Sequence, residues 1–299
     1  MKYPPIPWLA YACLALSTSL IGSYVGIAKL LLLAFPVFLL AWLRFGLAAV
    51  MMLGWLRQSA DELPLSARSR RLLFWESFLG NFLFSVCLLY GLKASSAMVA
   101  GVILAGIPAA VAMLGWLLLG ERISRQTMLG LICSVTGIAM VALERAEPAS
   151  DTSAFGALLL VAAMLCEASY VVIGKQLTAQ LTPKRISALI NLWGLVLVTP
   201  FGIWQALSFD FSAPSASHWG QLLFYAAAAS IISVWLWMTG LQKVPAAQAG
   251  VFQIFLPLAS ALVGLALGEQ MSLFQAMAFG LALLGLLLAT WPKRVDAIR

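Results

Sequence analysis

Long apolar runs, separated by short polar segments, fill almost the whole chain of 299 residues. A hydrocarbon core about 30 Å thick is crossed by roughly 20 apolar residues of helix. Ten runs come close to or exceed this length, and we expect each to form one transmembrane helix. Their ranges are 7–28, 35–55, 72–91, 97–119, 127–143, 155–174, 186–206, 219–240, 246–267 and 273–291. The pattern predicts an all-α integral membrane protein.

Short motifs in the first half of the chain recur in the second half after 146 to 150 residues. The pairs are Ser23–Lys29 with Ser169–Lys175, Leu72–Trp75 with Leu222–Tyr225, Ala100–Val102 with Ala249–Val251, Pro108 with Pro257, and Leu119–Glu121 with Leu267–Glu269. We therefore expect two homologous five-helix domains, 1–146 and 147–299. An odd number of spans inserts the second copy upside down, and inverted repeats are common in secondary transporters. A duplication kept only for stability is the alternative.

Positive charges are distributed unequally between the predicted loops. With the amino terminus inside, 14 of the 18 Lys and Arg residues fall on the inner side and only Lys29, Lys93 and Arg145 on the outer side. Loops rich in Lys and Arg stay in the cytoplasm, so we expect both termini there and the chain in the inner (plasma) membrane. The net charge of +7 belongs to this topology, so nucleic acid is not an expected partner.

Composition agrees with a lipid environment. The chain is 63% hydrophobic and 10% charged, with a mean hydropathy of +0.98, whereas soluble domains are about 25% charged. The single histidine, His218, has no ligand cluster around it in sequence, and no nucleotide-binding GxxxxGK[ST] loop occurs. We expect neither an enzyme nor a bound cofactor or metal.

Several motifs resemble the EamA repeat of the drug/metabolite transporter superfamily. They are Leu89–Ala97, the helix with Pro108, and Leu118–Ser124, with a looser second copy in Gly240–Ala249, Pro257 and Gly268-Glu269. Leu43-Arg44-Phe45 resembles the usual arginine position of that family, whereas the second copy has Leu192 there. The resemblance implies a ten-span exporter whose central cavity is lined mainly by spans 1, 3, 4, 6, 8 and 9. Among its branches, exporters of aromatic and other amino acids (YddG-like) match best.

Charged residues inside predicted spans are the first candidates for function, because each is costly in lipid unless paired or hydrated. Glu167 lies near the middle of span 6. It is interpreted either as a cavity group that binds an ammonium group or a proton, or as a partner of Arg44 or of a neighbouring helix. Arg44 itself is assigned a structural role, because the resemblance places it outside the cavity-lining spans. Glu76 is expected at the hydrated interface, and Glu121 and Glu269 at helix ends.

Polar and aromatic residues near the middle of the spans are the remaining candidates for substrate binding. They are Ser17, Thr18, Asn81, Ser85, Ser230, Ser233, Trp235, Phe252 and Gln253. Such a pocket suits a molecule with an apolar body and a small polar end. Pro108 and Pro257 free the carbonyls of Leu104 and Gln253 and are expected either to serve as hinges or to make static bends. Tyr24 and Tyr170 are expected to close gates at opposite mouths.

The sequence thus predicts a monomeric secondary transporter that exports small metabolites, with aromatic or other amino acids as the first candidates, by alternating access through a central cavity. Export of cationic drugs or other metabolites is the alternative within the same class. A channel-like facilitator is the alternative from another class.

Overall fold

The computed structural model describes residues 7–58, 62, 64–95, 97–144, 153–266 and 271–291. Its first half contains α1 (Trp8–Ala34), α2 (Val37–Met51), η1 (Leu53–Leu56), α3 (Ala67–Ser77), η2 (Phe78–Leu83), α4 (Phe84–Lys93), α5 (Ala97–Ala105), α6 (Ile107–Leu119) and α7 (Arg125–Glu144). The second half contains α8 (Ala154–Leu177), α9 (Pro183–Ala206), α10 (Ala216–Tyr225), η3 (Ala226–Ile232), α11 (Ser233–Lys243), α12 (Ala246–Val251), η4 (Phe252–Ile254), α13 (Phe255–Ala266) and α14 (Leu273–Thr290).

Some sequence expectations fall outside the described residues. These are the side chains of Lys29 and Lys93, residues Arg145, Gly268 and Glu269, and the charged residues of both chain ends.

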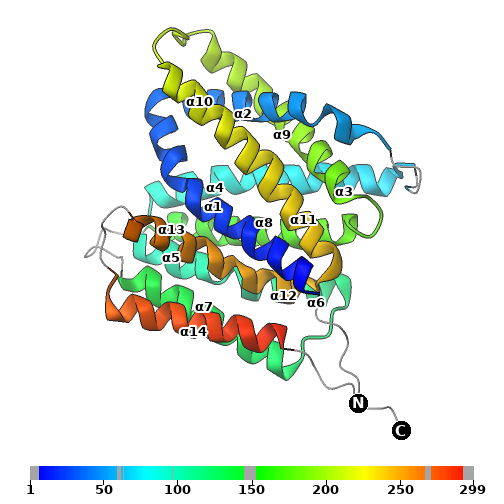
Figure 1. Cartoon of the computed structure of the whole chain (residues 1–299), viewed down its shortest axis with the longest axis vertical. Helices are drawn as coiled ribbons and strands as arrows, with labels where there is room; N and C mark the ends of the chain where they lie inside the picture. Colours follow the sequence, from blue (N-terminus) through cyan, green and yellow to red (C-terminus); the bar gives the residue numbers. More distant parts are fainter. Residues whose placement is uncertain are drawn as a thin grey trace.

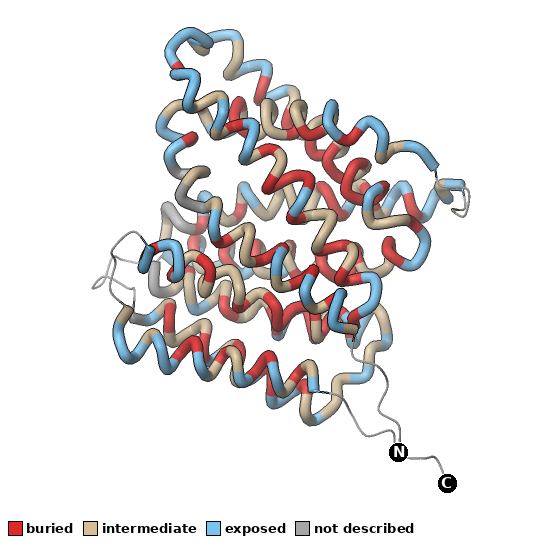
Figure 2. The backbone as a smooth tube through the Cα atoms, viewed as in Figure 1, coloured by how far each residue is buried: buried red, intermediate tan, exposed pale blue. Residues whose placement is uncertain are grey.

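All secondary structure of the described residues is helical, as the apolar pattern predicts. Among the described residues, eight continuous helical stretches are long and apolar enough to cross a membrane, and some of them join neighbouring elements, as α3, η2 and α4 do. Two shorter apolar stretches lie at Trp8–Tyr24, within α1, and at Val37–Met51. Large apolar side chains such as those of Leu33, Leu207 and Leu273 are strongly exposed. Exposed positions recur along the outer helices of the bundle (Figure 2). Such a surface is stable in lipid and not in water. The chain is therefore an integral membrane protein.

Helix α3 begins five residues before the apolar run 72–91 that predicts it. Ser66 caps its start by accepting a hydrogen bond from the backbone N–H of Ser69, so the helix includes the polar turn with Arg68 and Arg70. Hydropathy detects only the apolar part of such a helix. Glu76, placed one turn inside the predicted span, consequently lies more than two turns inside the actual helix.

Two kinds of interruption occur at matching places in the two halves. A π-helical segment, η2, joins α3 to α4, and a second one, η3, joins α10 to α11. The next segment is also divided in each half, into α5 and α6 at Gly106 and into α12, η4 and α13 at Phe252–Ile254. π-Helical turns and 3₁₀ turns within a helix often mark functional sites or hinges.

Helix packing also has the same pattern in both halves. Helix α1 packs against α11 and α13, and α8 packs against the corresponding α4 and α6. The remaining large contacts join corresponding helices directly, α2 with α9 and α7 with α14 (Figure 1). The α2–α9 pair is antiparallel, because Leu39 contacts Gln205 whereas Phe45 contacts Asn191.

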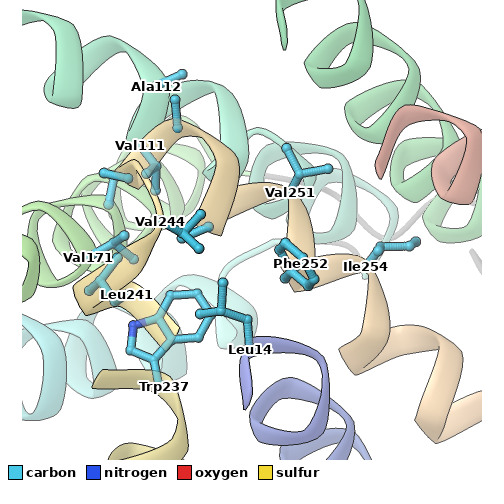
Figure 3. Close-up of a cluster of buried hydrophobic side chains, with 14 of the residues drawn as sticks. Leu14, Val111, Ala112, Val171, Trp237, Leu241, Val244, Val251, Phe252 and Ile254 are labelled. Carbon is cyan, nitrogen blue, oxygen red and sulfur yellow. The ribbon is translucent and has the colours of Figure 1, made fainter. Parts of the chain in front are cut away.

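The largest apolar cluster joins helices of both halves. Figure 3 shows part of it, with Leu14 of α1, Val171 of α8 and Trp237 of α11 around Val244, which precedes α12. Buried residues line the inner faces of the helices in the same way along the bundle (Figure 2). The two halves therefore share one core.

Glycines allow α7 and α14 to approach closely, as small residues do in membrane bundles. A methyl group at Gly137 would come within 2.6 Å of the Ala278 carbonyl oxygen and 2.7 Å of the Ala282 nitrogen. We expect Gly137→Ala to destabilise the protein by about 1–3 kcal/mol, because overpacked backbone contacts cannot relax easily. Thermal unfolding in detergent measures the change. Gly280→Ala on α14 is the matched control. A methyl group at Gly280 would have no neighbouring atom of another helix within 4 Å, so this change should not lower stability.

Candidate substrate site

Arg44 of α2 points its charged group into the bundle centre. Its guanidinium Nη1 donates a hydrogen bond of 3.0 Å to the hydroxyl of Ser230 in η3. The guanidinium carbon also lies 4.3 Å from the ring centre of Phe45 and 5.5 Å from that of Tyr225, within the range of cation–π attraction. The sequence analysis assigned Ser230 to the site and favoured a structural role for Arg44.

Glu167 is the charged residue of α8 within its apolar run. Its carboxylate accepts a hydrogen bond of 3.2 Å from the side-chain amide of Gln253 in η4. Within the described part of the chain it forms no ion pair with Arg44. The interpretation of Glu167 as a fixed partner of Arg44 therefore fails, and the hydrogen bond to a neighbouring helix is what the structure shows.

Two tyrosines interact with these charged groups. The ring of Tyr24 makes an edge contact with Tyr225, with 5.3 Å between ring centres, and Tyr24 interacts electrostatically with Arg44. Tyr170 interacts with Tyr24, Glu76 and Glu167. Tyr24 and Tyr170 thus belong to one internal polar cluster and not to two distant mouths. Their role in gating stays a prediction.

A small cavity of about 30 Å³ lies inside this cluster. Its lining includes Arg44, Asn81, Tyr170 and Ser230, together with Ser187 and Asn191 of α9, which sequence reasoning missed. A volume of this size holds about one water molecule and no metabolite. This cavity therefore has no room for a metabolite in the conformation described.

Two larger depressions lie elsewhere. A groove of about 760 Å³ between α6 and α7 is lined mostly by apolar side chains, among them exposed Met113 and Trp116, as expected for a lipid-facing surface. A vestibule of about 320 Å³ is lined by Glu121, Arg122, Lys175 and Lys243 at one end of the bundle. Neither contains the residues of the central cluster.

Four predicted ligands are buried in helix contacts. The hydroxyl of Ser17 donates to the Ser233 carbonyl at 2.7 Å, and that of Thr18 donates to the Phe252 carbonyl at 3.0 Å. The Ser233 hydroxyl donates to Ala229 within its own helix. Phe252 packs against Tyr11, with 5.4 Å between ring centres. In this conformation these side chains hold α1 against α11 and η4.

Other predicted residues lie at the edges of the cluster. Asn81 donates a hydrogen bond of 3.2 Å to Ser77 and lines the cavity, whereas Ser85 is exposed and bonds back to the Asn81 carbonyl. Trp235 packs against Trp55, with 6.1 Å between ring centres. Pro108 stands at the start of α6, directly after the break at Gly106, and Pro257 stands in the first turn of α13.

Two acidic residues have clear structural surroundings. The Glu121 carboxylate accepts hydrogen bonds from the backbone N–H groups of Ala246 and Ala247, at 2.8 and 3.2 Å, and so caps the start of α12. Glu76 is wholly buried, and neither of its carboxylate oxygens has a hydrogen-bond partner in the described structure. The expectation of a hydrated interfacial Glu76 is wrong, because α3 carries it deep between α8 and α11.

Comparison with known proteins identifies the family. The model of the EamA-like transporter family matches residues 8–143 and again residues 154–291. The chain belongs to the EamA-like transporter family. The match to almost the whole chain decides this membership, in agreement with the resemblance seen in the motifs.

Relatives of this EamA-like transporter carry the same general description. The uncharacterized transporter YetK of Bacillus subtilis (strain 168) is 33% identical over 257 residues, which cover 85% of this chain and 78% of YetK. The uncharacterized transporter YyaM of the same organism is 25% identical over 261 residues, 85% of this chain and 84% of YyaM. A solved crystal structure covers 95% of the chain with a TM-score of 0.74 at 18% identity, which shows a shared fold. The chain is a membrane transporter.

Proposed function

We propose that this transporter exports amino acids, with aromatic ones as the first candidates, by alternating access through the central cluster. The observation that carries the proposal is the separation of Arg44 from Glu167. Each is hydrogen-bonded to a neutral side chain, Ser230 and Gln253 respectively, and neither neutralises the other. Opposite charges kept apart near the bundle centre fit a zwitterion.

The chemistry of the cluster matches the two ends of an amino acid. A guanidinium binds a carboxylate through parallel hydrogen bonds, and a carboxylate binds an ammonium group. Tyr24, Tyr170 and Tyr225 supply ring surface between these charges. Such a mostly apolar site with few polar groups favours an aromatic or apolar side chain on the substrate.

Alternating access draws support from the matched architecture of the two halves. We propose ten spans in two inverted five-helix repeats, 1–146 and 147–299. The π-helical segments η2 and η3 stand at equivalent positions beside the cluster, and α7 and α14 pack antiparallel, as inverted copies would. Small changes of backbone conformation at η2, η3 and the divided segments would open the central cluster to one side of the membrane at a time.

We further propose the inner (plasma) membrane as its location, with both chain ends in the cytoplasm and a monomer as the working unit. The start of α1 and the end of α14 lie at the same end of the bundle, where the Tyr11 hydroxyl contacts the Thr290 carbonyl at 3.5 Å. The basic vestibule with Lys175 and Lys243 lies at the end of α11, which packs against the start of α1. The excess of positive charge at this end favours its cytoplasmic placement.

Counterflow in proteoliposomes tests the function. Vesicles loaded with unlabelled phenylalanine, tryptophan or leucine should accumulate the labelled amino acid, with saturation, and protein-free vesicles should not. Accumulation of an aromatic cation but of no amino acid would replace the proposal by export of cationic drugs. Non-saturable flux with measurable conductance would instead identify a channel-like facilitator.

A further inference from the structure

Glu76 occupies a site in which a charged carboxylate is not stable. The residue is fully buried, with both carboxylate oxygens unpartnered in the described structure. Oε1 lies only 2.8 Å from the place where a methyl group on Gly174 would stand, and the Met238 methyl group and the Leu241 side chain border the same place. The carboxyl group therefore fills the space left by a glycine, among apolar side chains of α8 and α11.

The charged and titratable groups nearby do not neutralise it. On α8, Tyr170 interacts electrostatically with Glu76 and with Glu167. On α9, Arg185 is bound to Glu62, and on α8, Lys175 donates to the carbonyls of Leu241 and Gln242. Because an isolated buried charge costs several kcal/mol, the carboxyl group is stable here only with its proton.

The place of Glu76 beside the π-helical segment η2 gives this proton a function. The residue lies on α3, directly before η2, and the Tyr170 ring packs on Gly80 within η2. Separation of η2 from α8 would move Tyr170 and admit water to the carboxyl group. A hydrated carboxyl group releases its proton to water and remains as a carboxylate, and it takes a proton back from the other side before it is buried again.

We propose that Glu76 is the proton-binding group that couples export to proton entry, separate from the substrate contacts of Arg44 and Glu167. This inference rests on the proposed transport of amino acids and adds proton entry as the force that drives it. A carboxylate must regain its proton before the closed conformation can form without cost. Proton uptake and the conformational change are therefore linked by the burial of one side chain.

Proteoliposomes with an internal pH-sensitive dye test the proposal. Addition of the substrate identified by counterflow should produce proton movement with wild-type protein. Glu76→Gln should reduce it to the level of protein-free liposomes while exchange of labelled for unlabelled substrate persists, because the amide mimics the protonated state. Asp210→Asn, which changes an exposed carboxylate in the α9–α10 connection, is the control and should leave proton movement unchanged.

A chemical probe supplies a second test that needs no variant. Dicyclohexylcarbodiimide adds to protonated carboxyl groups in apolar surroundings and leaves a stable acylurea. Mass spectrometry of the labelled wild-type protein should find the adduct on Glu76, and labelling should stop proton movement.

The outcomes separate this inference from the function on which it rests. Wild-type exchange without proton movement, retained proton movement in Glu76→Gln, or an unlabelled Glu76 would each overturn the coupling role and leave amino acid transport intact. Absence of amino acid exchange by the wild-type protein would overturn the transport proposal and this inference with it.

Discussion

Replacement of Arg44 by Gln is expected to lower amino acid exchange by about tenfold or more, the effect of losing a hydrogen bond from a charged group. Gln keeps a donor for Ser230 but removes the positive charge and the planar fork that would bind the substrate carboxylate. Arg44→Lys should give an intermediate rate, because an ammonium group retains the charge without bidentate geometry. Initial rates of counterflow at several substrate concentrations measure both effects.

Arg68→Gln provides the matched control for this experiment. Arg68 is an exposed arginine of α3 that donates a long hydrogen bond of 3.4 Å to Gln176 at the bundle surface. Its replacement should leave exchange unchanged. Equal rates for Arg44→Gln and the wild-type protein would contradict the assignment of Arg44 to the substrate and return it to a structural role.

Replacement of Arg185 by Met is expected to destabilise the protein by about 3 kcal/mol, the lower end of the cost of breaking a buried ion pair. Nη1 of Arg185 lies 2.7 Å from a carboxylate oxygen of Glu62, and the two side chains are 9% and 5% exposed. The second oxygen of Glu62 accepts a hydrogen bond from the Thr182 backbone. The pair thereby joins Glu62 to the start of α9, and the loss of Arg185 leaves a buried carboxylate without its charged partner.

The same pair predicts a pH dependence of stability. Burial raises the pKa of Glu62, but the hydrogen bonds from Thr182 and Arg185 outweigh it and hold the pKa below its usual value. Its stabilising contribution is therefore present above the pKa of the unfolded chain and is lost as the pH falls through the lower, folded value. Unfolding in detergent from pH 7 to pH 3 measures this loss.

The double variant Glu62→Gln with Arg185→Met is the control for both measurements. It leaves no unpaired charge, so it should be more stable than Arg185→Met alone and should lose the acid dependence of this site. A single Arg185→Met protein as stable as wild type would show that the pair contributes nothing.

The sequence predicted the helical segments well where hydropathy alone defines them. The range 186–206 falls within α9, whereas the range 72–91 begins five residues late. The late start has a physical reason, since the arginines of the first turns of α3 reach polar surroundings from a helix that continues inward. The mean hydropathy of such a turn is low, so the predicted span begins only after it.

The candidate site was predicted only in part. Glu167, Ser230 and Gln253 were recognised as polar residues in apolar runs, and the structure brings them to the central cluster. Glu76 was placed wrongly at the hydrated interface, because hydropathy missed the polar first turns of α3. For Arg44, hydropathy indicated a position inside a span but not the direction of its side chain. Contacts with Ser230 in one case and Gly174 in the other decide their surroundings.

The amino-acid sequence by itself determined that this protein is a helical membrane protein with an internally repeated, EamA-like organisation. Apolar run lengths and motif spacing are properties of the chain alone, and lipid imposes a helix on each long run. Only the tertiary structure decided which polar side chains meet, which are enclosed and which remain without a partner. These properties depend on the rotation and closeness of helices far apart in sequence, as where the absent side chain of Gly174 makes room for the carboxyl group of Glu76.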